Sequence, residues 1–267
     1  MFDEITKHKY KEFLSEEKKH KRIIFFAKII ILVSFILFWE LSARYGLSDP
    51  FLTSSPSAIV KTIINLIRTN ALFIHIIVTT AETLIGFVVG TISGVAIACL
   101  LWYFPTASKV CEPYLITLNA LPKIALGPII IVWAGANFNA IIFMTLLISL
   151  IVTIISIYGS FTTADNEKLT LMKTFNASRM QMLTKVVLPW SVPGIFNALK
   201  INVGMSWVGV IMGEFLVSKA GLGYLIIYGS NVFNLSLVMT GVLLLAVIAA
   251  LMYFVVAFFE RRVLRNR

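Results

Sequence analysis

Asn166–Pro193 reads NEKLTLMKTFNASRMQMLTKVVLPWSVP and is the longest polar interruption in a strongly apolar sequence. It lies between two apolar stretches, Ile141–Tyr158 and Ile195–Val217, each of which is long enough to cross a bilayer. Apolar residues recur within it at three- to five-residue steps, with basic residues between them, as in an amphipathic helix: Leu169, Met172, Phe175, Met180 and Leu183.

This segment is expected to form two short helices that are joined by a turn near Asn176-Ala177-Ser178. Ser178 is a residue type that caps the start of a helix, and Pro189 is expected to stop the helix that follows. An amphipathic segment that is held outside the membrane between two spans suits a helix-in-groove contact with a soluble partner. A solvated connecting loop is the alternative interpretation.

The composition bounds the class of protein. Hydrophobic residues make up 58% of the 267 residues, whereas roughly half is usual for a soluble domain. We therefore expect an all-α integral membrane protein. The formal net charge of +10 does not indicate a nucleic-acid partner, because the basic residues gather at the edges of the apolar stretches. The two cysteines, Cys99 and Cys111, supply neither a disulfide framework nor a metal site.

Six apolar stretches are candidates for transmembrane helices, at residues 23–39, 72–104, 111–133, 139–158, 195–217 and 235–259. The third is expected to be broken at Pro122 and at Gly127-Pro128, with residues 105–109 as a short inner turn. Residues 23–259 would then form a single transmembrane domain. Residues 1–22 are expected to be an amphipathic segment on the cytoplasmic membrane surface, and residues 260–267 a basic cytoplasmic tail.

Two segments are expected on the outer side. Residues 44–57 should form an external loop that leads into an amphipathic helix, Ser57–Arg68, and Gly221-Leu222-Gly223-Tyr224 should form an external turn or a re-entrant loop. In this topology sixteen Lys and Arg residues lie on the inner side and four on the outer side. Basic residues favour the cytoplasmic side, so the count supports cytoplasmic N- and C-termini.

Three glycines in the second span, Gly86, Gly90 and Gly94, are spaced four residues apart. Glycines at this spacing form a face that another helix can approach closely. We expect this face to pack against a neighbouring helix, with incidental glycines as the alternative.

Four polar or aromatic residues within the spans are candidates for the translocation pathway. Lys123 follows Pro122 in the broken span and could attract an anion, or could form an ion pair or snorkel to the inner surface. Asn202, Ser206 and Trp207 share a face near the middle of the fifth span and could line a cavity, although ordinary packing is an equal alternative for Trp207.

Two acidic residues also lie within spans. Glu214 is expected to make a structural hydrogen bond or to pair with Lys219. Glu82 is expected to be paired or to face a subunit interface.

The polar segment resembles the cytoplasmic coupling loop of binding-protein-dependent ABC importer permeases, which here would span residues 161–190. The resemblance rests on three runs: Lys173-Thr174-Phe175-Asn176-Ala177-Ser178-Arg179, Val187-Leu188-Pro189 and Pro193-Gly194-Ile195. Thr170-Leu171-Met172 stand where that family has Glu-Ala-Ala, and Asn176 stands where it has glycine. Asn is the next best residue for a left-handed turn, so the bend is still expected.

Further motifs extend the resemblance over more than two hundred residues, to the nitrate/sulfonate/taurine branch of these permeases. They are Phe38-Trp39-Glu40-Leu41 with Pro56-Ser57, His75 through Gly94, Ala120-Leu121-Pro122-Lys123-Ile124-Ala125, and Gly221-Leu222-Gly223-Tyr224-Leu225-Ile226.

The resemblance implies a type I ABC importer permease fold in the cell membrane. It implies that Lys173 through Arg179 contact a pair of separate ATPase subunits, which would bind ATP and Mg. It also implies a second permease, either a copy of this chain or a related one, and an extracellular or lipid-anchored substrate-binding protein. The solute would be a small anion such as a sulfonate, taurine or nitrate, or else a pyrimidine vitamin precursor or a flavin.

The chain itself carries no recognisable chemistry. Its sequence contains no Gly-x-x-x-x-Gly-Lys-Ser/Thr loop, no His-Glu-x-x-His pair and no Gly-x-Ser-x-Gly elbow. We expect no catalytic residue, no metal and no cofactor on this chain. An ion-coupled secondary transporter and a membrane-embedded enzyme are the alternatives from other classes, and the coupling loop argues against both.

Overall fold

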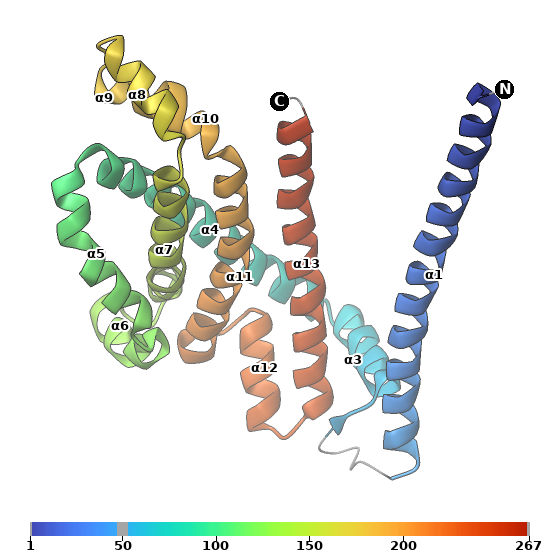
Figure 1. Ribbon diagram of the computed structural model, residues 1–267. Helices are drawn as coiled ribbons and strands as arrows, with labels where there is room; N and C mark the ends of the chain where they lie inside the picture. Colours follow the sequence, from blue (N-terminus) through green and yellow to red (C-terminus); the bar gives the residue numbers. More distant parts are fainter. Residues whose placement is uncertain (1, 47–52, 266–267) are drawn as a thin grey trace. The chain divides into compact units, whose positions relative to one another are not determined.

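The computed structural model describes residues 2–46 and 53–265, and within these ranges every regular element is a helix (Figure 1). The chain divides into two units, Met1–Thr62 and Ile63–Arg267, which are described separately. Residues 47–52 of the predicted external loop and the last two residues of the predicted basic tail lie outside the described residues, as do the side chains of residues 1–15 on the predicted amphipathic face.

The first unit contains one long helix, α1 (Phe2–Arg44). No glycine or proline occurs between these two residues, so nothing in the sequence interrupts the backbone hydrogen bonds. The helix accordingly runs across the predicted boundary at residue 22. The N-terminal segment and the first span are therefore one continuous helix.

Glu40 connects the end of α1 to the start of α3 (Pro56–Arg68). One of its carboxylate oxygens accepts a hydrogen bond from Arg44 Nε at 2.7 Å, and the other accepts from the backbone N–H of Ser57 at 3.0 Å. The first N–H groups of a helix have no partner within the helix, so the Glu40 carboxylate caps α3. The hydrogen bond between Glu40 and Ser57 thus joins the Phe38–Leu41 motif to the Pro56-Ser57 motif.

The second unit is a bundle built around α7 (Phe138–Thr162), which packs most extensively against α11 (Val192–Val217) and α4 (Ala71–Tyr103). The remaining elements are α5 (Pro105–Ala120), η1 (Lys123–Leu126), α6 (Gly127–Ala134), α12 (Leu222–Asn231) and α13 (Leu235–Arg265). Between α7 and α11 the chain forms α8 (Asn166–Thr174), α9 (Arg179–Met182), the π-helical turn η2 (Leu183–Val187) and α10 (Leu188–Trp190).

The described residues contain five helices that are long and apolar enough to cross a membrane, and six spans if α5 with η1–α6 counts as one broken span. The two halves of that pair meet at an angle of 86°, so the predicted break at Pro122 is confirmed. Gly127-Pro128 does not add a second break but begins α6. The predicted turn at residues 105–109 was wrong, because Pro105 begins α5. Proline is favoured in the first turn of a helix, where its missing N–H costs nothing.

The Gly221–Tyr224 motif was expected to form an external turn or a re-entrant loop. In the structure the bend ends at Gly221, and residues 222–224 already belong to the ten-residue helix α12. Gly221 has a φ of 119°, a conformation that L side chains rarely adopt. The motif is therefore the start of a helix that packs against α13, α11 and α4.

The three predicted glycines lie where α4 meets α7. A Cβ atom built on Gly86, Gly90 or Gly94 would lie 2.5, 2.8 or 2.6 Å from a side-chain atom of Thr145, Ser149 or Thr153 respectively. Gly209 of α11 approaches the same part of α7, since a Cβ there would lie 2.5 Å from Thr145 Cα. Thr145 and Thr153 donate their hydroxyl hydrogens to carbonyls of their own helix, so these small side chains are satisfied without a distant partner. Glycines on α4 and α11 thus allow both helices to pack closely against α7.

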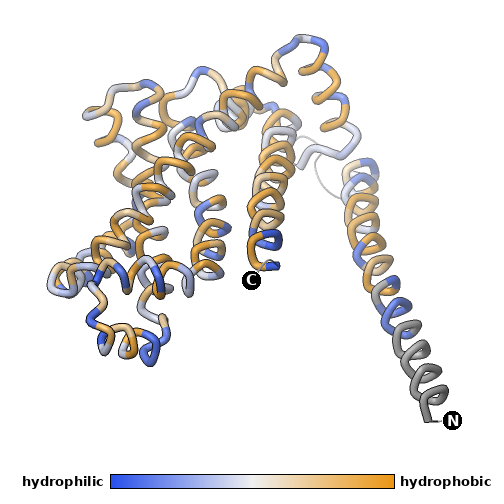
Figure 2. Tube along the Cα trace, turned by 90° about the horizontal axis from the view of Figure 1, so that it is seen from above, coloured by the Kyte–Doolittle hydropathy of each residue, from blue (hydrophilic) through white to orange (hydrophobic). Residues whose placement is uncertain are grey.

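The surface of α13 is strongly apolar until its last turns. Figure 2 shows hydrophobic residues along this helix and hydrophilic ones at its C-terminal end. Several large apolar side chains there are exposed within the unit, among them Val247, Leu251, Phe254 and Phe258. Such a continuous apolar face is typical of a helix that contacts lipid or another subunit.

We predict that Gly94→Ala destabilises the protein more than Gly204→Ala does. The added methyl group at Gly94 would collide with Thr153, whereas nothing lies within 4 Å of the corresponding position at Gly204, also in a helix. Overpacking costs about 1–3 kcal/mol, while Ala is better than Gly by about 1 kcal/mol in an open helical position. The melting temperatures of the two variants are measured by thermal unfolding in detergent. Equal melting temperatures would contradict this packing.

Candidate functional site

Residues 163–191, between α7 and α11, form two short helical pieces that project from one end of the bundle, and we call them the coupling segment. Figure 1 shows α8, α9 and α10 at the same end of the second unit as the C-terminus of α13. This segment contains the motif that the sequence singled out.

Asp165 starts the first piece. Its carboxylate accepts hydrogen bonds from the backbone N–H groups of Glu167 at 3.0 Å and Lys168 at 3.4 Å, and so caps α8. Partial desolvation raises the pKa of this carboxyl, but these N–H donors and the Lys168 charge outweigh it and bring the pKa below its usual value. The cap is therefore charged at neutral pH. The sequence reasoning missed it, although an Asp directly before a polar helix is a start signal.

The turn between the two pieces has the predicted form. Asn176 has a φ of 54°, in the left-handed region, and the N–H of Ala177 bonds back to the carbonyl of Met172 at 3.0 Å, as in a Schellman helix end. Ser178 then caps α9: its hydroxyl accepts from the N–H of Gln181, whose side chain accepts from the N–H of Ser178. The predicted left-handed turn and the predicted Ser178 cap are both confirmed.

Pro189 does not end the second piece, and that prediction was wrong. The chain stays helical through η2 and α10, and the N–H of Ser191 bonds to the carbonyl of Val187 at 2.9 Å. A proline removes one backbone donor, and the π-helical turn before it changes the hydrogen-bond spacing so that the helical path continues. Ser191 then leads directly into α11.

One side of the coupling segment is buried against the bundle. Leu183 and Val187 are 5% and 0% exposed, and they belong to a core cluster with Ala98 of α4, Ile157 of α7 and Ala198 of α11. Leu169 of α8 packs against the same cluster. A solvated loop would not bury such residues, so the alternative of an unattached connection does not describe this segment.

Arg179 fastens the segment to α4, and Lys168 connects residues within the segment. Arg179 donates from Nη2 to the backbone carbonyl of Trp102 at 3.0 Å, near the C-terminal end of α4, and lies over the Trp102 ring at 5.3 Å. Lys168 lies 3.5 Å from Asp165 Oδ2 and over the Trp190 ring at 5.1 Å. A cation at a helix C-terminus and over an aromatic face is favourable. Arg179, expected at a docking surface, therefore orients the segment.

The two ends of the segment are joined to each other. The hydroxyl of Ser191 donates to the carbonyl of Ser160 at 3.0 Å, and Gly194 lies directly against the Ser160 side chain, where a Cβ would overlap its hydroxyl. This gives the Pro193-Gly194 motif a steric reason. Because α7 and α11 meet at this point, the coupling segment cannot tilt without moving both helices.

The other side of the segment is open. Leu171, Phe175 and Met180 are 56%, 74% and 57% exposed. Four further members of the predicted motif are exposed between them, namely Lys173, Thr174, Asn176 and Ser178, and Ala177 is half-buried. Three large apolar side chains on a small polar protrusion form a surface suited to an aromatic or aliphatic groove on a partner.

Lys123 occupies the break in the third span. Its ammonium group donates to the backbone carbonyl of Asn119 at 2.9 Å, one of the last carbonyls of α5, which have no partner within the helix. The structure thus gives Lys123 a role in closing the end of α5. An additional role in attracting an anion stays a prediction.

Asn202, Ser206 and Trp207 are 1%, 0% and 6% exposed. Asn202 donates to Thr91 Oγ1 of α4 at 2.8 Å, so this face of α11 packs inside the bundle in the described conformation. Their burial favours packing for all three residues, not only for Trp207. Asn202 Oδ1, Ser206 Oγ and Trp207 Nε1 have no hydrogen-bond partner within the described part of the chain.

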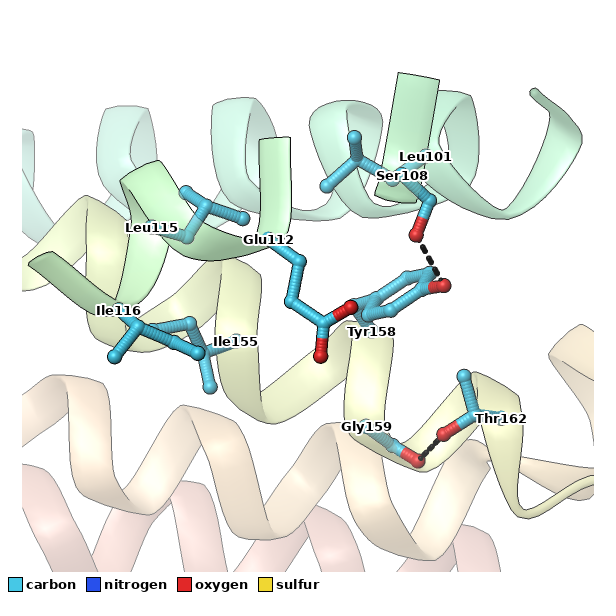
Figure 3. A pocket seen from close by; sticks show the side chains of 9 residues that line it. All are labelled: Leu101, Ser108, Glu112, Leu115, Ile116, Ile155, Tyr158, Gly159 and Thr162. Carbon is cyan, nitrogen blue, oxygen red and sulfur yellow. Dashed lines mark hydrogen bonds between the residues drawn. The ribbon is translucent and has the colours of Figure 1, made fainter. Parts of the chain in front are cut away.

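A cavity of about 490 Å³ lies between α5 and α7, next to the end of α4. Figure 3 shows Glu112, Ser108 and Tyr158 among its lining residues, with the Ser108 hydroxyl donating to the Tyr158 oxygen. The walls are otherwise mainly aliphatic, formed by Leu101, Leu115, Ile116 and Ile155. An apolar cavity with one carboxylate and three hydroxyl groups, those of Ser108, Tyr158 and Thr162, has the make-up of a small-molecule site.

Residues 86–265 match the model of a known family, the binding-protein-dependent transport system inner membrane component. The chain belongs to this family. It is a multi-pass membrane permease and a transport subunit rather than an enzyme.

Several relatives of the permease are similar over most of their length. A probable ABC transporter permease protein of Haemophilus influenzae is 29% identical over 85% of this chain and 91% of that protein. The putative aliphatic sulfonates transport permease protein SsuC of Bacillus subtilis is 23% identical over 96% and 93%. The formylaminopyrimidine transport permease protein ThiX of Halalkalibacterium halodurans is 27% identical over 71% and 75%.

The fold of the permease is that of solved importers. It matches a chain of the MetNI methionine ABC transporter in an inward-facing conformation with a TM-score of 0.65, at 19% identity, over 73% of this chain and 97% of that chain. At this level of identity the match supports the fold alone.

We predict that Asn176→Val loosens the coupling segment whereas Asn176→Gly leaves it intact. A β-branched residue in the left-handed region costs about 1–2 kcal/mol, and glycine costs nothing there. Hydrogen exchange at residues 163–191 in detergent measures the difference. Equal protection in the two variants would contradict the turn.

Proposed function

We propose that this permease is the transmembrane subunit of an ATP-driven importer and that the coupling segment is the surface on which an ATPase subunit acts. The observation that carries the proposal is the two-sided build of this segment. Leu183 and Val187 fix one side to α4, α7 and α11, while Leu171, Phe175 and Met180 leave the other side apolar and open. A protrusion whose one side is packed on the bundle and whose other side is exposed can transmit a movement of a bound partner to the helices.

The proposed assembly has two ATPase subunits, which bind ATP and Mg, two permease subunits and an extracellular or lipid-anchored substrate-binding protein. A second copy of this chain is the simplest second permease. The family assignment supports ATPase and binding-protein partners in general. We place the permease in the cell membrane. The basic residues of the coupling segment and of the C-terminal end of α13 support a cytoplasmic location for these two parts of the chain.

The mechanism follows from the contacts of the segment. When the ATPase subunits close on ATP, they move the two coupling segments toward each other. Each segment is joined to α7 and α11 through Ser160 and Ser191, and to α4 through Arg179 and Trp102. The three helices therefore tilt together and change which side of the membrane the pathway faces. ATP drives this change only because it binds the two states with different affinities.

For the solute we propose a small anion such as a sulfonate, taurine or nitrate. Support comes from the similarity to the Bacillus subtilis sulfonate permease, which extends over 96% of this chain. Selectivity is expected to rest largely with the binding protein.

A pyrimidine vitamin precursor is the second candidate, and the cavity gives it a specific argument. Glu112, Ser108 and Tyr158 offer a carboxylate and hydroxyl oxygens to a solute, and such groups accept hydrogen bonds from amino groups. An aminopyrimidine, like the ammonium end of taurine, carries such donors, and nitrate does not. Uptake of labelled taurine in competition with an aminopyrimidine separates the two candidates.

We predict that Phe175→Ala weakens ATPase binding by about tenfold or more, because a large exposed aromatic at the centre of an apolar surface is the type of residue that dominates an interface. The tagged permease is purified from its native membranes in mild detergent, and the amount of co-purifying P-loop ATPase is measured.

The matched control for this experiment is Phe138→Ala. Phe138 is also exposed, at 46%, and is the first residue of α7, whose other end leads into the coupling segment. This variant should retain the ATPase. A wild-type chain that purifies without an ATPase and transports solute with only an ion gradient would replace the proposal with a secondary transporter.

A further inference from the structure

The first turn of α12 is held by side chains from two other helices. Four consecutive backbone N–H groups, from Gly221 to Tyr224, each donate to a side chain: Gly221 to His75 Nδ1 at 2.9 Å, Leu222 to Thr79 Oγ1 at 2.6 Å, and Gly223 and Tyr224 to Glu214 Oε2 at 2.6 and 3.3 Å. These are the donors that a helix start leaves without partners. Here α4 and α11 satisfy all four.

The Glu214 carboxyl group occupies the space that side chains at positions 221 and 223 would need. It is 1% exposed, and a Cβ on Gly223 would lie 2.8 Å from its Oε2 atom, while a Cβ on Gly221 would overlap the carboxyl group. The two glycines of Gly221-Leu222-Gly223 therefore make room for the carboxylate. A negative charge is favourable in this position, since two N–H donors and the positive end of the α12 dipole face it.

A second acidic side chain lies next to the first. Glu82 of α4 is 5% exposed. It lies three residues after Thr79, on the same face of α4, and Thr79 and Glu214 accept hydrogen bonds from neighbouring N–H groups of α12, so Glu82 and Glu214 approach the same turn. One oxygen of each, Glu82 Oε2 and Glu214 Oε1, receives no hydrogen bond from an N–H or O–H group of the described residues. Buried acceptors without a donor are costly, and a hydrogen held between the two carboxyls would supply one.

The neighbouring groups do not supply a compensating cation. His75 accepts from Gly221 at Nδ1, so that nitrogen carries no hydrogen and the ring is neutral, and the ring stacks on Tyr224 at 5.9 Å. Thr79 is uncharged, and Lys219, the partner considered for Glu214, is exposed. The N–H groups at the start of α12 thus stabilise one negative charge on the two carboxyl groups. A second negative charge would have no such partner among the groups named here.

We propose that Glu82 and Glu214 form a buried proton-binding site, in which the two carboxyl groups share one proton and together carry a single negative charge toward the start of α12. Two carboxyl groups in one site hold a proton between them when the environment cannot stabilise both charges. The proton supplies the donor that the two unpaired oxygens lack.

The site connects the three helices at the end of the bundle away from the coupling segment. Glu82 belongs to α4 and Glu214 to α11, and both act on α12. Because the proton is held more strongly while the two carboxyls share it, proton binding and the α4–α11 contact stabilise each other by linkage. A conformation that separates these helices and exposes the carboxyls to water would favour release of the proton.

Infrared difference spectroscopy tests the proposal directly on the wild-type protein. A protonated carboxyl gives a C=O stretch that is resolved from ionised carboxylate and shifts in D₂O. At neutral pH the wild type should show such a band, Glu82→Gln should lose it, and Glu167→Gln, which changes an exposed carboxyl on α8, should keep it.

Thermal unfolding adds a second readout. The amide of Glu82→Gln can donate to Glu214 in place of the proton, so this variant should unfold close to the wild-type temperature near neutral pH, while Glu82→Ala should unfold at a clearly lower one. As the pH is raised, the wild type loses its shared proton, and its unfolding temperature should fall below that of Glu82→Gln, in which no shared proton can be lost.

Two results would overturn the proposal. One is a wild type without a D₂O-sensitive carboxyl band. The other is a band that survives in Glu82→Gln, which would assign it to another residue. If the band appears only after Na⁺ or Ca²⁺ is removed, a metal cation rather than a proton lies between the carboxyls, and the proposal is equally refuted.

Discussion

The close approach of α4 and α11 to α7 is the constraint on which the second unit depends. Gly86, Gly90 and Gly94 bring α4 against the small hydroxyl side chains of α7, and Gly209 brings α11 against the α7 backbone at Thr145. Within lipid, apolar side chains gain little by moving from lipid onto another helix, so close packing has to supply the stability. Glycine and small hydroxyl residues are what such packing requires.

The core formed by α4, α7 and α11 positions the coupling segment at one end and the start of α12 at the other. At one end Leu183 and Val187 fasten the coupling segment to all three helices, and Ser191 joins its two ends. At the other end, side chains of α4 and α11 hold the start of α12 through its backbone N–H groups. A displacement applied to the coupling segment therefore reaches the opposite end through packed side chains and hydrogen bonds, which is the physical connection that coupling between sites needs.

Much of this architecture could be predicted from the sequence because the relevant patterns are local. Apolar length identifies spans, Ser178 identifies a cap, and an Asn in place of a glycine still permits a left-handed turn. Other features depend on contacts between distant residues. Pro189 is a helix-stop signal in the sequence, yet the helical path continues because a π-helical turn precedes it. The contact of Arg179 with Trp102 could not be predicted, because the two residues are far apart in the sequence. The burial of Asn202, Ser206 and Trp207 likewise depends on tertiary packing, which the sequence pattern of one helix does not contain.

The central claim is that the coupling segment and the transmembrane helices move as one body under the control of ATP. The most direct test is the distance between the coupling segments of two copies of this chain in the proposed transporter, measured by pulsed electron paramagnetic resonance. A spin label is placed at Glu167→Cys, an exposed α8 position, after Cys99 and Cys111 are replaced. The account predicts that the distance shortens when ATP is bound and hydrolysis is blocked. An unchanged distance in a transporter that still imports its solute would contradict it.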